Sequence, residues 1–316
     1  MSDVNNNSPI LEVKNLSMHF TMGRGRKKMV NKAVNNVSFD VMEGETFGLV
    51  GETGCGKTTT GRTIIKLYQP TDGEIILKGK NIEGNLKGAD KKFVSTNIQM
   101  VFQDPISSLN PRMTVRDIVA EGLVINKMCA NSKERLELVY EMLETVGLSK
   151  DHATRYPHEF SGGQRQRIGV ARALITKPSV IIADEPISAL DVSIQAQVLN
   201  LLNDLKKKLG ITMLFIAHDL SVVKYISNRI AVMYGGRIVE LGDAKEVYSN
   251  PIHPYTKSLL SAIPLPNPEY ERNRKRLRYD PTMHNYSALE PEMVELLPKH
   301  FVLGTPDEIE NYKKEL

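Results

Sequence analysis

The sequence contains a glycine-rich run with a lysine and two threonines at its end, flanked by an apolar segment and a helix-compatible stretch. Residues 49–59 read LVGETGCGKTT and match the pattern G-x-x-x-x-G-K-[ST]. Glycines let the backbone turn tightly and aim its N–H groups inward, and the next helix adds partial positive charge at its N-terminus. Lys57 would reach the outer phosphates of a nucleotide, and the Thr58 hydroxyl can ligate Mg2+. We therefore predict a nucleoside triphosphate site, since the alternative, a glycine-rich turn without a ligand, explains fewer of these residues. The predicted binding residues are Gly51, Glu52, Thr53, Gly54, Cys55, Gly56, Lys57, Thr58 and Thr59.

Two adjacent carboxylates follow an apolar run in the second half of the chain. The run 180–183 reads VIIA and precedes Asp184 and Glu185. Continuous apolar runs are expected of strands buried on both faces of a parallel sheet, and ligands bind at the carboxyl edge of such sheets. We predict that Asp184 holds Mg2+, directly or through water, and that Glu185 polarises the water that attacks the γ-phosphate. The alternative is a solvated acidic turn after a strand.

A second anion site is predicted where Ser161, Gly162, Gly163 and Gln164 precede a helical stripe. Ser161 can cap the helix, and the paired glycines allow a phosphate to approach bare N–H groups at the positive end of the helix dipole. One γ-phosphate cannot easily satisfy two helix N-termini in one small subunit. We therefore expect this second site to serve a nucleotide held by a partner.

The remaining periodicity predicts an α/β protein. Residues 11–50 alternate apolar and polar in short pieces, which suggests half-buried antiparallel strands. The run 213–217 before His218 is continuous, as in a buried parallel strand. Between such runs, Val198, Leu202, Leu205 and Leu209 have helical spacing and are followed by Gly210, a helix-ending residue.

Residues 104–160 show two amphipathic helical patterns without a convincing strand between them. Thr114 and Asp117 resemble a capping box at the start of the first pattern, and the second ends at Gly147. We predict an inserted helical subdomain at about 104–165. The stripes are Val115, Ile118, Val119 and Leu123 in the first pattern, and Leu136, Val139, Leu143 and Val146 in the second.

A domain edge is predicted after Ile263, because three prolines follow within 264–268 and the sequence beyond is charged with weak periodicity. The predicted domains are a nucleotide-binding domain over 1–263 and a C-terminal extension over 264–316.

Size and composition favour a folded globular protein that works in the cytosol. The chain has 316 residues and 41% hydrophobic content, without an apolar run of membrane-spanning length or a signal-peptide layout at its start. Its two cysteines, Cys55 and Cys129, lie far apart, which fits a reducing compartment and excludes a cysteine-ligated metal site. A net charge of +4 does not argue for nucleic acid as a partner.

From about residue 11 to 260, the chain resembles the ATP-binding-cassette (ABC) family, and the matching motifs occur in the family's order. The resemblance implies a P-loop NTPase of the ABC type, with an antiparallel β subdomain, a helical subdomain, ATP and Mg2+ as cofactors, and two subunits that sandwich two ATP molecules. It also implies catalytic roles for Lys57, Gln103, Glu185 and His218, and a role for Gln103 with Thr58 and Asp184 at the metal. The matching segments are Phe20 for adenine stacking, Walker A at 51–59, the Q-loop at Gln103, the signature FSGGQ at 160–164, Walker B at 180–184, the D-loop SALD at 188–191 and the switch histidine His218.

Residues 250–264, NPIHPYTKSLLSAIP, resemble the extension of ATP-binding subunits from bacterial peptide permeases, and the tail 279–316 is similar to F-type subunits of Gram-positive oligopeptide permeases. This resemblance implies a heterodimer with a D-type ATPase beneath two integral membrane permeases, supplied by an extracellular peptide-binding protein. The location it implies is the cytoplasmic face of the bacterial membrane. No cysteine follows Cys129, so the cysteine cluster that some sister subunits carry is not expected here.

Several residues have structural alternatives. Phe20 could be a strand aromatic in the core, His218 a structural residue and Gln103 a surface amide. We hypothesise that the helix N-terminus lowers the pKa of Cys55 and makes its thiol alkylatable. The basic clusters 24–28 and 272–278 are either solvated or contact lipid head groups or an acidic partner surface.

Three other functions stay open at this point. Relatives of peptide permeases that import nickel or opines share these motifs. A cassette protein of translation or DNA repair would act on nucleic acid, but two cassettes or long inserted arms are missing. A regulatory module without turnover is disfavoured by Glu185 and His218.

Overall fold

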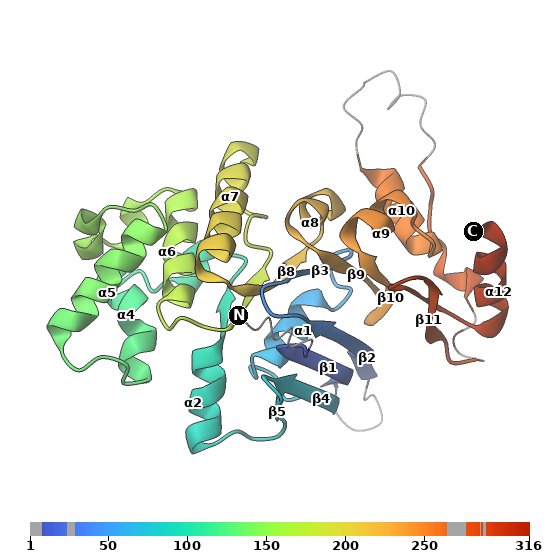
Figure 1. The fold of residues 1–316 in the computed structure, drawn as a ribbon, viewed down its shortest axis with the longest axis horizontal. Helices are drawn as coiled ribbons and strands as arrows, with labels where there is room; N and C mark the ends of the chain where they lie inside the picture. The colour runs from blue at the N-terminus through green and yellow to red at the C-terminus, as the bar shows by residue number, and fades with distance from the viewer. Residues whose placement is uncertain (1–7, 24–28, 264–275, 285, 287–288) are drawn as a thin grey trace, which may run out of the picture.

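The computed structural model describes residues 8–23, 29–263, 276–284, 286 and 289–316. These residues form two sheets with helices around and between them (Figure 1). The basic cluster 24–28, the proline-rich segment 264–268 and most of the second basic cluster lie outside the described residues. Within the described part of the chain, no helix is both long and apolar enough to cross a membrane.

The smaller sheet is antiparallel and has the strand order β2-β1-β4-β5. Val37, Phe39 and Val41 of β2 are buried in alternation with more exposed neighbours, as the sequence pattern predicts. The antiparallel subdomain is therefore confirmed. Its strands are β1 (Leu11–Met22), β2 (Met29–Val41), β4 (Asp72–Leu77) and β5 (Lys80–Asn81).

The larger sheet has eight strands in the order β11-β12-β10-β9-β3-β8-β7-β6, and the neighbours from β9 to β6 are parallel. The prediction that 11–50 is half-buried and antiparallel throughout is wrong for β3, which is buried at every residue between parallel neighbours. Five residues are too few for periodicity to distinguish a half-buried strand from a fully buried one. The strands are β3 (Thr46–Val50), β6 (Ile98–Val101), β7 (Val180–Asp184), β8 (Thr212–Ala217), β9 (Arg229–Tyr234), β10 (Arg237–Asp243), β11 (Glu292–Leu297) and β12 (His300–Gly304).

Helix α1 (Lys57–Ile64) lies between the two sheets and contacts β1 and β2 on one side and β7 and β8 on the other. Gly61 permits this close packing, because a Cβ there would lie 2.9 Å from Ile216 Cδ1 and 3.2 Å from Ile182 Cγ2. The first helix after the predicted phosphate loop is thus held on both sides. This packing fixes the direction in which its N-terminus points.

A helical group covers one end of the larger sheet and contains α4, α5 and α6 (Figure 1). Its first apolar stripe is buried as predicted, but Leu136 of the second is only partly buried. The capping box at Thr114 is wrong in detail, because the Thr114 hydroxyl bonds the Asp117 carboxylate and caps no backbone N–H. The helices of this region are α2 (Gly88–Asn97), α3 (Pro105–Ser108), α4 (Val115–Ile125), α5 (Ser132–Thr145) and α6 (Gly162–Leu174), with short 3-10 turns at Lys150–Thr154 and Pro157–Glu159.

The second half of the chain adds helices along the other strands. Helix α7 ends where the sequence predicts, since Gly210 adopts the left-handed conformation with φ 63°. Leu209 is half-exposed, however, so the predicted stripe is buried only through Leu205. These helices are α7 (Val192–Leu209), α8 (Leu220–Ile226), α9 (Ala244–Ser249), α10 (Pro254–Ala262) and α12 (Pro306–Glu315), with a 3-10 turn at Pro281–Met283.

The C-terminal segment continues the larger sheet. Strand β12 pairs with β10 through Glu240↔Val302 and Leu241↔Phe301, and β11 pairs with β12. Both strands are antiparallel and extend the parallel block at the end opposite β6. The division of the chain into domains at 263 and 264 stays a prediction, because the edge adjoins residues outside the described part.

Candidate nucleotide site

The predicted phosphate loop connects the buried strand β3 to α1 and depends on two glycines where the backbone is crowded. A Cβ at Gly51 would lie 2.1 Å from the carbonyl oxygen of Met233, and one at Gly56 would lie 2.2 Å from that of Ala33. Gly56 also has φ 112°, which residues with a side chain rarely adopt. The loop can therefore keep this shape only with glycine at both positions.

Lys57 is buried and folds back over the loop that precedes it. Its ammonium donates hydrogen bonds to the carbonyl oxygens of Gly51, at 2.7 Å, and Glu52, at 2.8 Å. The side chain is only 3% exposed, so the charge is satisfied by the loop's own carbonyls. The ammonium is thus held at the loop that is predicted to bind the outer phosphates of a nucleotide.

Thr58 and Asp184, which the sequence predicts as magnesium ligands, meet at the carboxyl edge of β7. The Thr58 hydroxyl donates to Asp184 Oδ1 at 2.8 Å, while the buried Oδ2 has no hydrogen-bond partner among the described residues. Burial raises the pKa of Asp184, although the bond from Thr58 opposes this shift. A fully buried carboxylate with one unpaired oxygen beside a hydroxyl fits a hard cation such as Mg2+, which binds proteins through one or two oxygens and keeps waters and phosphates as other ligands.

No cluster of three or more His, Cys, Asp or Glu side chains suited to a metal is present in the described ranges. A Mg2+ ion that is held in part by a nucleotide's phosphates needs few protein ligands. If bound, the ion would be held by Thr58 and Asp184 and would neutralise charge on the phosphates.

Glu185 lies together with Gln103 and His218, two residues to which the family resemblance assigns catalytic roles. Gln103 Nε2 donates to Glu185 Oε2 at 3.0 Å, and His218 Nδ1 lies 3.4 Å from the same oxygen. Glu185 has φ 43°, an uncommon conformation for a residue with a side chain, immediately after the end of β7. Glu185 Oε2 thus connects a residue that follows β6 with the residue that follows β8.

The surroundings of Gln103 and His218 bear on whether Gln103 is only a surface amide and His218 only a structural residue. Gln103 is exposed, so the alternative of a surface residue stays open, but its amide is hydrogen-bonded to Glu185. The His218 side chain is 54% exposed, which leaves one face of the imidazole accessible to a ligand. Their assignment as catalytic residues, and of Gln103 as a metal ligand, stays a prediction.

Phe20 lies on β1 and is half-buried. Its ring packs edge-on against Tyr68, with centroids 5.4 Å apart, and it belongs to none of the large buried clusters. A core packing role is therefore not supported, and a ring with an accessible face suits the predicted stacking on adenine.

The Ser161 region forms a capped helix start, as predicted. Ser161 Oγ accepts a hydrogen bond from Gln164 N at 3.3 Å, and Gln164 Oε1 accepts one from Ser161 N at 3.1 Å. A pocket of about 270 Å³ lies beside this end of α6 and is lined in part by Ser161, Gly163 and Gln164. Figure 1 shows α6 in the helical group, apart from α1 and its loop. In the described residues, no hydrogen bond joins 161–164 to 51–59.

The hypothesis of a reactive Cys55 is contradicted. The thiol is buried, with 7% of the residue exposed, and burial raises its pKa despite the nearby Lys57 ammonium. A raised pKa leaves less thiolate, which is the nucleophilic form. The sequence suggested a helix N-terminus, but it did not reveal that loop and strand would enclose the sulfur.

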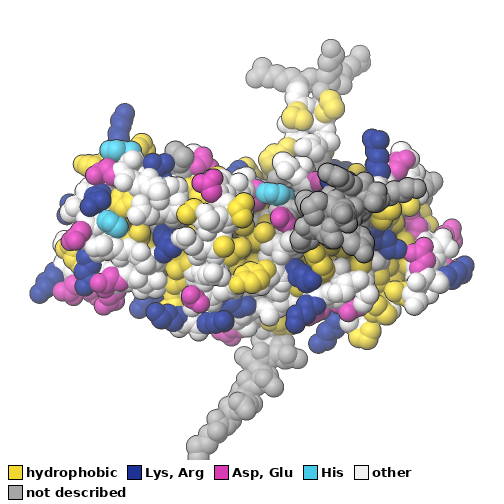
Figure 2. All heavy atoms as spheres, turned by 90° about the horizontal axis from the view of Figure 1, so that it is seen from above, with side chains coloured by type: hydrophobic (Ala, Val, Ile, Leu, Met, Phe, Trp, Pro, Cys, Tyr) yellow, Lys and Arg dark blue, Asp and Glu magenta, His cyan; other side chains and the backbone are white. Residues whose placement is uncertain are grey.

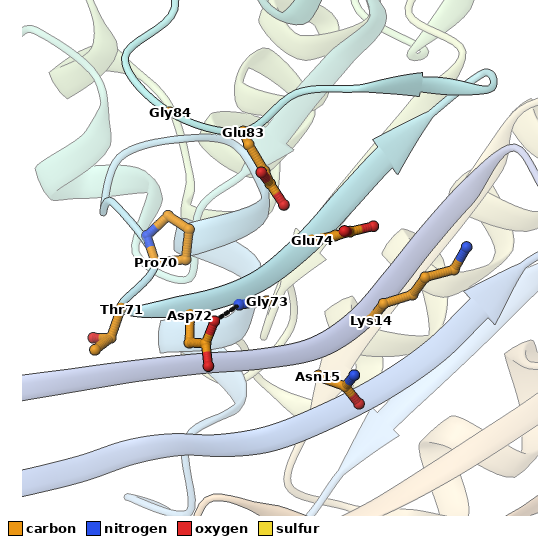
Figure 3. A pocket seen from close by; sticks show the side chains of 9 residues that line it. All are labelled: Lys14, Asn15, Pro70, Thr71, Asp72, Gly73, Glu74, Glu83 and Gly84. Carbon is orange, nitrogen blue, oxygen red and sulfur yellow. Dashed lines mark hydrogen bonds between the residues drawn. The ribbon is translucent and has the colours of Figure 1, made fainter.

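A larger pocket of about 600 Å³ lies on the antiparallel sheet, and Figure 3 shows its lining. The carboxylates of Asp72, Glu74 and Glu83 are among the lining side chains, and none of the predicted site residues is. Acidic side chains repel phosphate, so this hollow does not compete with the loop as a nucleotide site.

One contact to the phosphate loop was missed in the sequence. The Tyr255 hydroxyl of α10 accepts a hydrogen bond from Glu52 N at 3.0 Å. In the sequence, the segment NPIHPYT indicates only a resemblance to the extension of peptide-permease subunits. No periodicity connects residues 203 positions apart, so only the fold could reveal this contact.

The phosphate loop, the Thr58–Asp184 pair and Glu185 therefore lie together at the carboxyl edge of the parallel strands. This is the arrangement of a P-loop nucleotide-binding protein. Comparison with known proteins gives the family. The ABC transporter family model matches residues 34–188, and the model of the oligopeptide/dipeptide transporter C-terminal region matches 239–288.

Similar proteins span almost the whole chain. It is 60% identical to an oligopeptide transport ATP-binding protein of Bacillus subtilis, over 96% of this chain and 98% of that one. It is 58% identical to a dipeptide transport ATP-binding protein of Lactococcus lactis, over 96% and 97%. A solved dimeric, post-hydrolysis structure of the ATP-binding cassette MJ0796 with ADP and Pi is 29% identical with a TM-score of 0.66, over 74% of this chain and 98% of that one. The chain belongs to the ATP-binding proteins of the ABC transporter family.

Proposed function

We propose that this chain hydrolyses ATP to drive peptide import through membrane permeases. The observation that carries the proposal is the pair of contacts at the end of β7, where Asp184 accepts from Thr58 at 2.8 Å and Glu185 accepts from Gln103 at 3.0 Å. These contacts support a role for Asp184 at the metal and a role for Glu185 at the attacking water. The cofactors are ATP and Mg2+.

In this proposal the loop residues Lys57 and Thr58 bind the phosphates and the metal, and Glu185 takes the proton of the attacking water. Gln103 and His218 hold Glu185 in position, and His218 faces the γ-phosphate from its exposed side. Phe20 stacks on adenine. The residues 161–164 act on the nucleotide of a second ATPase subunit, because their capped helix start lies apart from the loop of the same chain.

The peptide class follows from the relatives, whose names specify oligopeptide or dipeptide transport, and from the match of 239–288 to the oligopeptide/dipeptide transporter C-terminal region. The expected partners are a D-type ATPase and two integral membrane permeases, with an extracellular peptide-binding protein acting indirectly. The chain would then work at the cytoplasmic face of the membrane. Nickel or opine import is the less favoured alternative, because the similar proteins reported above are named for peptides.

A nucleic-acid role is disfavoured by charge. The net charge is only +4, and Figure 2 shows acidic and basic side chains interspersed on the visible face. A protein that binds the phosphate backbone needs a clustered basic surface.

The proposal is tested by Glu185→Gln, which keeps the side-chain shape and removes the base. We expect phosphate release from ATP to fall at least about 100-fold while ATP binding is retained. In cells that lack the chain, uptake of dipeptides and of longer peptides should be lost and should return with the wild-type gene but not with the variant. Unchanged turnover in Glu185→Gln would contradict the ATPase mechanism, and unchanged peptide uptake would contradict the substrate class.

A further inference from the structure

The peptide unit between Gly51 and Glu52 is held from both ends. Its carbonyl oxygen, on Gly51, accepts a hydrogen bond from Lys57 Nζ at 2.7 Å. Its N–H, on Glu52, donates to the Tyr255 hydroxyl at 3.0 Å. The first bond comes from the phosphate loop itself, whereas the second comes from α10, about 200 residues further along the chain. The orientation of this peptide therefore depends on a residue that lies within the matched C-terminal region.

Tyr255 is placed rigidly enough for this contact. It is 1% exposed, and its ring packs against Tyr234 and Tyr279 with centroids 4.5 and 5.2 Å away. Burial raises the pKa of Tyr255 well above its usual range, so the phenol stays neutral at physiological pH. A neutral, immobilised hydroxyl loses little further entropy when it accepts the bond from Glu52.

The turn before α10 is fixed by one buried carboxylate. Glu240, which is fully buried on β10, accepts from Ile252 N at 2.8 Å and from His253 N at 3.0 Å. Its Oε1 also lies 2.7 Å from His300 Nε2 on β12. Three groups from two segments thus satisfy this carboxylate, as a buried charge requires.

His253 completes the connection to Tyr255. Its Nδ1 accepts a hydrogen bond from Tyr255 N at 3.1 Å, which caps α10. Burial, with the neighbouring His284 and Lys257, lowers the pKa of His253 to about 3, so the ring is neutral and Nδ1 can accept. The path from β10 to the phosphate loop therefore consists of buried groups that are paired at each step.

From this geometry we propose that Tyr255 is a positioning residue for the phosphate loop, through which the C-terminal segment sets the affinity of this chain for ATP. The inference rests on the proposed function. The hydroxyl fixes the plane of the Gly51–Glu52 peptide, and this plane determines where the carbonyl holds the Lys57 ammonium. Without the hydroxyl, the peptide can rotate about the torsions of Gly51, which has no Cβ to restrict them. Ordering the loop then costs free energy when ATP binds, and this cost lowers the affinity for ATP.

The test compares Tyr255→Phe with Tyr312→Phe in the full-length protein. Tyr312 is a matched control because it is also buried, at 6% exposure, and packs against His253. Its hydroxyl has no hydrogen-bond partner in the part of the chain that the structure describes. The probe is the β,γ-imido analogue of ATP with Mg2+, titrated by calorimetry so that hydrolysis does not interfere. The unfolding temperature of each ligand-free protein is measured by circular dichroism.

We expect the dissociation constant of the analogue to rise about threefold to tenfold in Tyr255→Phe, as for the loss of one hydrogen bond, and to stay within about 1.5-fold in Tyr312→Phe. Glu240→Gln should also raise the dissociation constant, because one of the two backbone donors, Ile252 N or His253 N, loses its charged acceptor. A purely structural role would lower the unfolding temperature of Tyr255→Phe and leave the dissociation constant unchanged, which would overturn the inference. Equal weakening in both tyrosine variants would overturn it as well. If the wild-type protein does not bind the analogue, the proposed function fails first, and this inference fails with it.

Discussion

Replacing Thr58 by valine removes the hydrogen bond to Asp184 and keeps the shape of the side chain. The bond from Thr58 is the one that Asp184 receives from another side chain, since Oδ2 has no partner and Oδ1 accepts the hydroxyl at 2.8 Å. Asp184 is fully buried, so water cannot replace the lost donor without a change of structure. The variant therefore leaves a buried carboxylate without compensation.

The magnitude follows from the cost of an unsatisfied buried acceptor. We expect the free energy of unfolding of the ligand-free protein to fall by about 1–3 kcal/mol at pH 8. The Thr58 bond lowers the pKa of Asp184 against a larger rise caused by burial, so the variant's pKa should be raised further. A carboxyl group whose pKa is higher in the folded than in the unfolded protein contributes stability in its protonated form. This contribution is complete below the pKa of the unfolded state and is lost as the pH rises through the pKa of the folded state. The difference between wild type and Thr58→Val should accordingly be largest at pH 8 and shrink as the medium is acidified.

The assay is urea unfolding at pH 8 and pH 5.5, followed by circular dichroism because the chain has no tryptophan. Thr63→Val is the matched control on the same helix, since the Thr63 hydroxyl donates to the Thr59 backbone carbonyl at 2.7 Å and touches no carboxylate. It should cost less than about 1 kcal/mol, without a pH trend. A Thr58→Val loss no larger than that of Thr63→Val, or one that grows on acidification, would refute the reasoning.

Two further predictions concern the same loop. At pH 7.5, Cys55 should react with maleimide much more slowly in the folded protein than in urea, because burial encloses the sulfur and raises the pKa of the thiol. Equal labelling rates, measured by mass spectrometry, would contradict this prediction. Gly51→Ala should weaken ATP binding at least about tenfold by calorimetry, since its Cβ would lie 2.1 Å from the Met233 carbonyl oxygen. Gly54→Ala is the control for backbone conformation, because a Cβ there meets no described atom within 4 Å, and it should lose less affinity for ATP.

The sequence predicts features correctly where a local pattern can be combined with a general rule about strand ends or helix ends. Asp184 and Glu185 follow a buried run, and the strand that this run forms is parallel to both of its neighbours, so the two carboxylates lie at the carboxyl edge of the sheet as predicted. Gly210 follows the last turn of a helical stripe, and the helix ends there with a left-handed residue. In both cases the relevant neighbours are close in sequence or are placed by topology alone.

The features that the sequence did not predict depend on packing between distant segments. The burial of Cys55 arises from its neighbours in the fold, and the contact between Tyr255 and Glu52 joins segments that share no pattern. Leu209 fits its helical stripe by spacing, but it is half-exposed and lines a pocket together with Leu138 and Ile211. Spacing identifies which face of a helix is apolar, whereas burial also depends on what lies opposite.

Asp184 and the helix start at Ser161, both within the described residues, are suited to different binding partners. Asp184 Oδ2 is buried without a donor, so it can be satisfied only by something small that enters the loop of the same chain, such as a cation with its nucleotide. The capped helix start at Ser161 is exposed, so it can be reached by a ligand attached to another molecule. Any ligand that binds only the folded state adds stability. Mg-ATP should therefore stabilise the isolated chain through Asp184 at any protein concentration, whereas a contribution from Ser161 should depend on protein concentration, because it requires a second subunit.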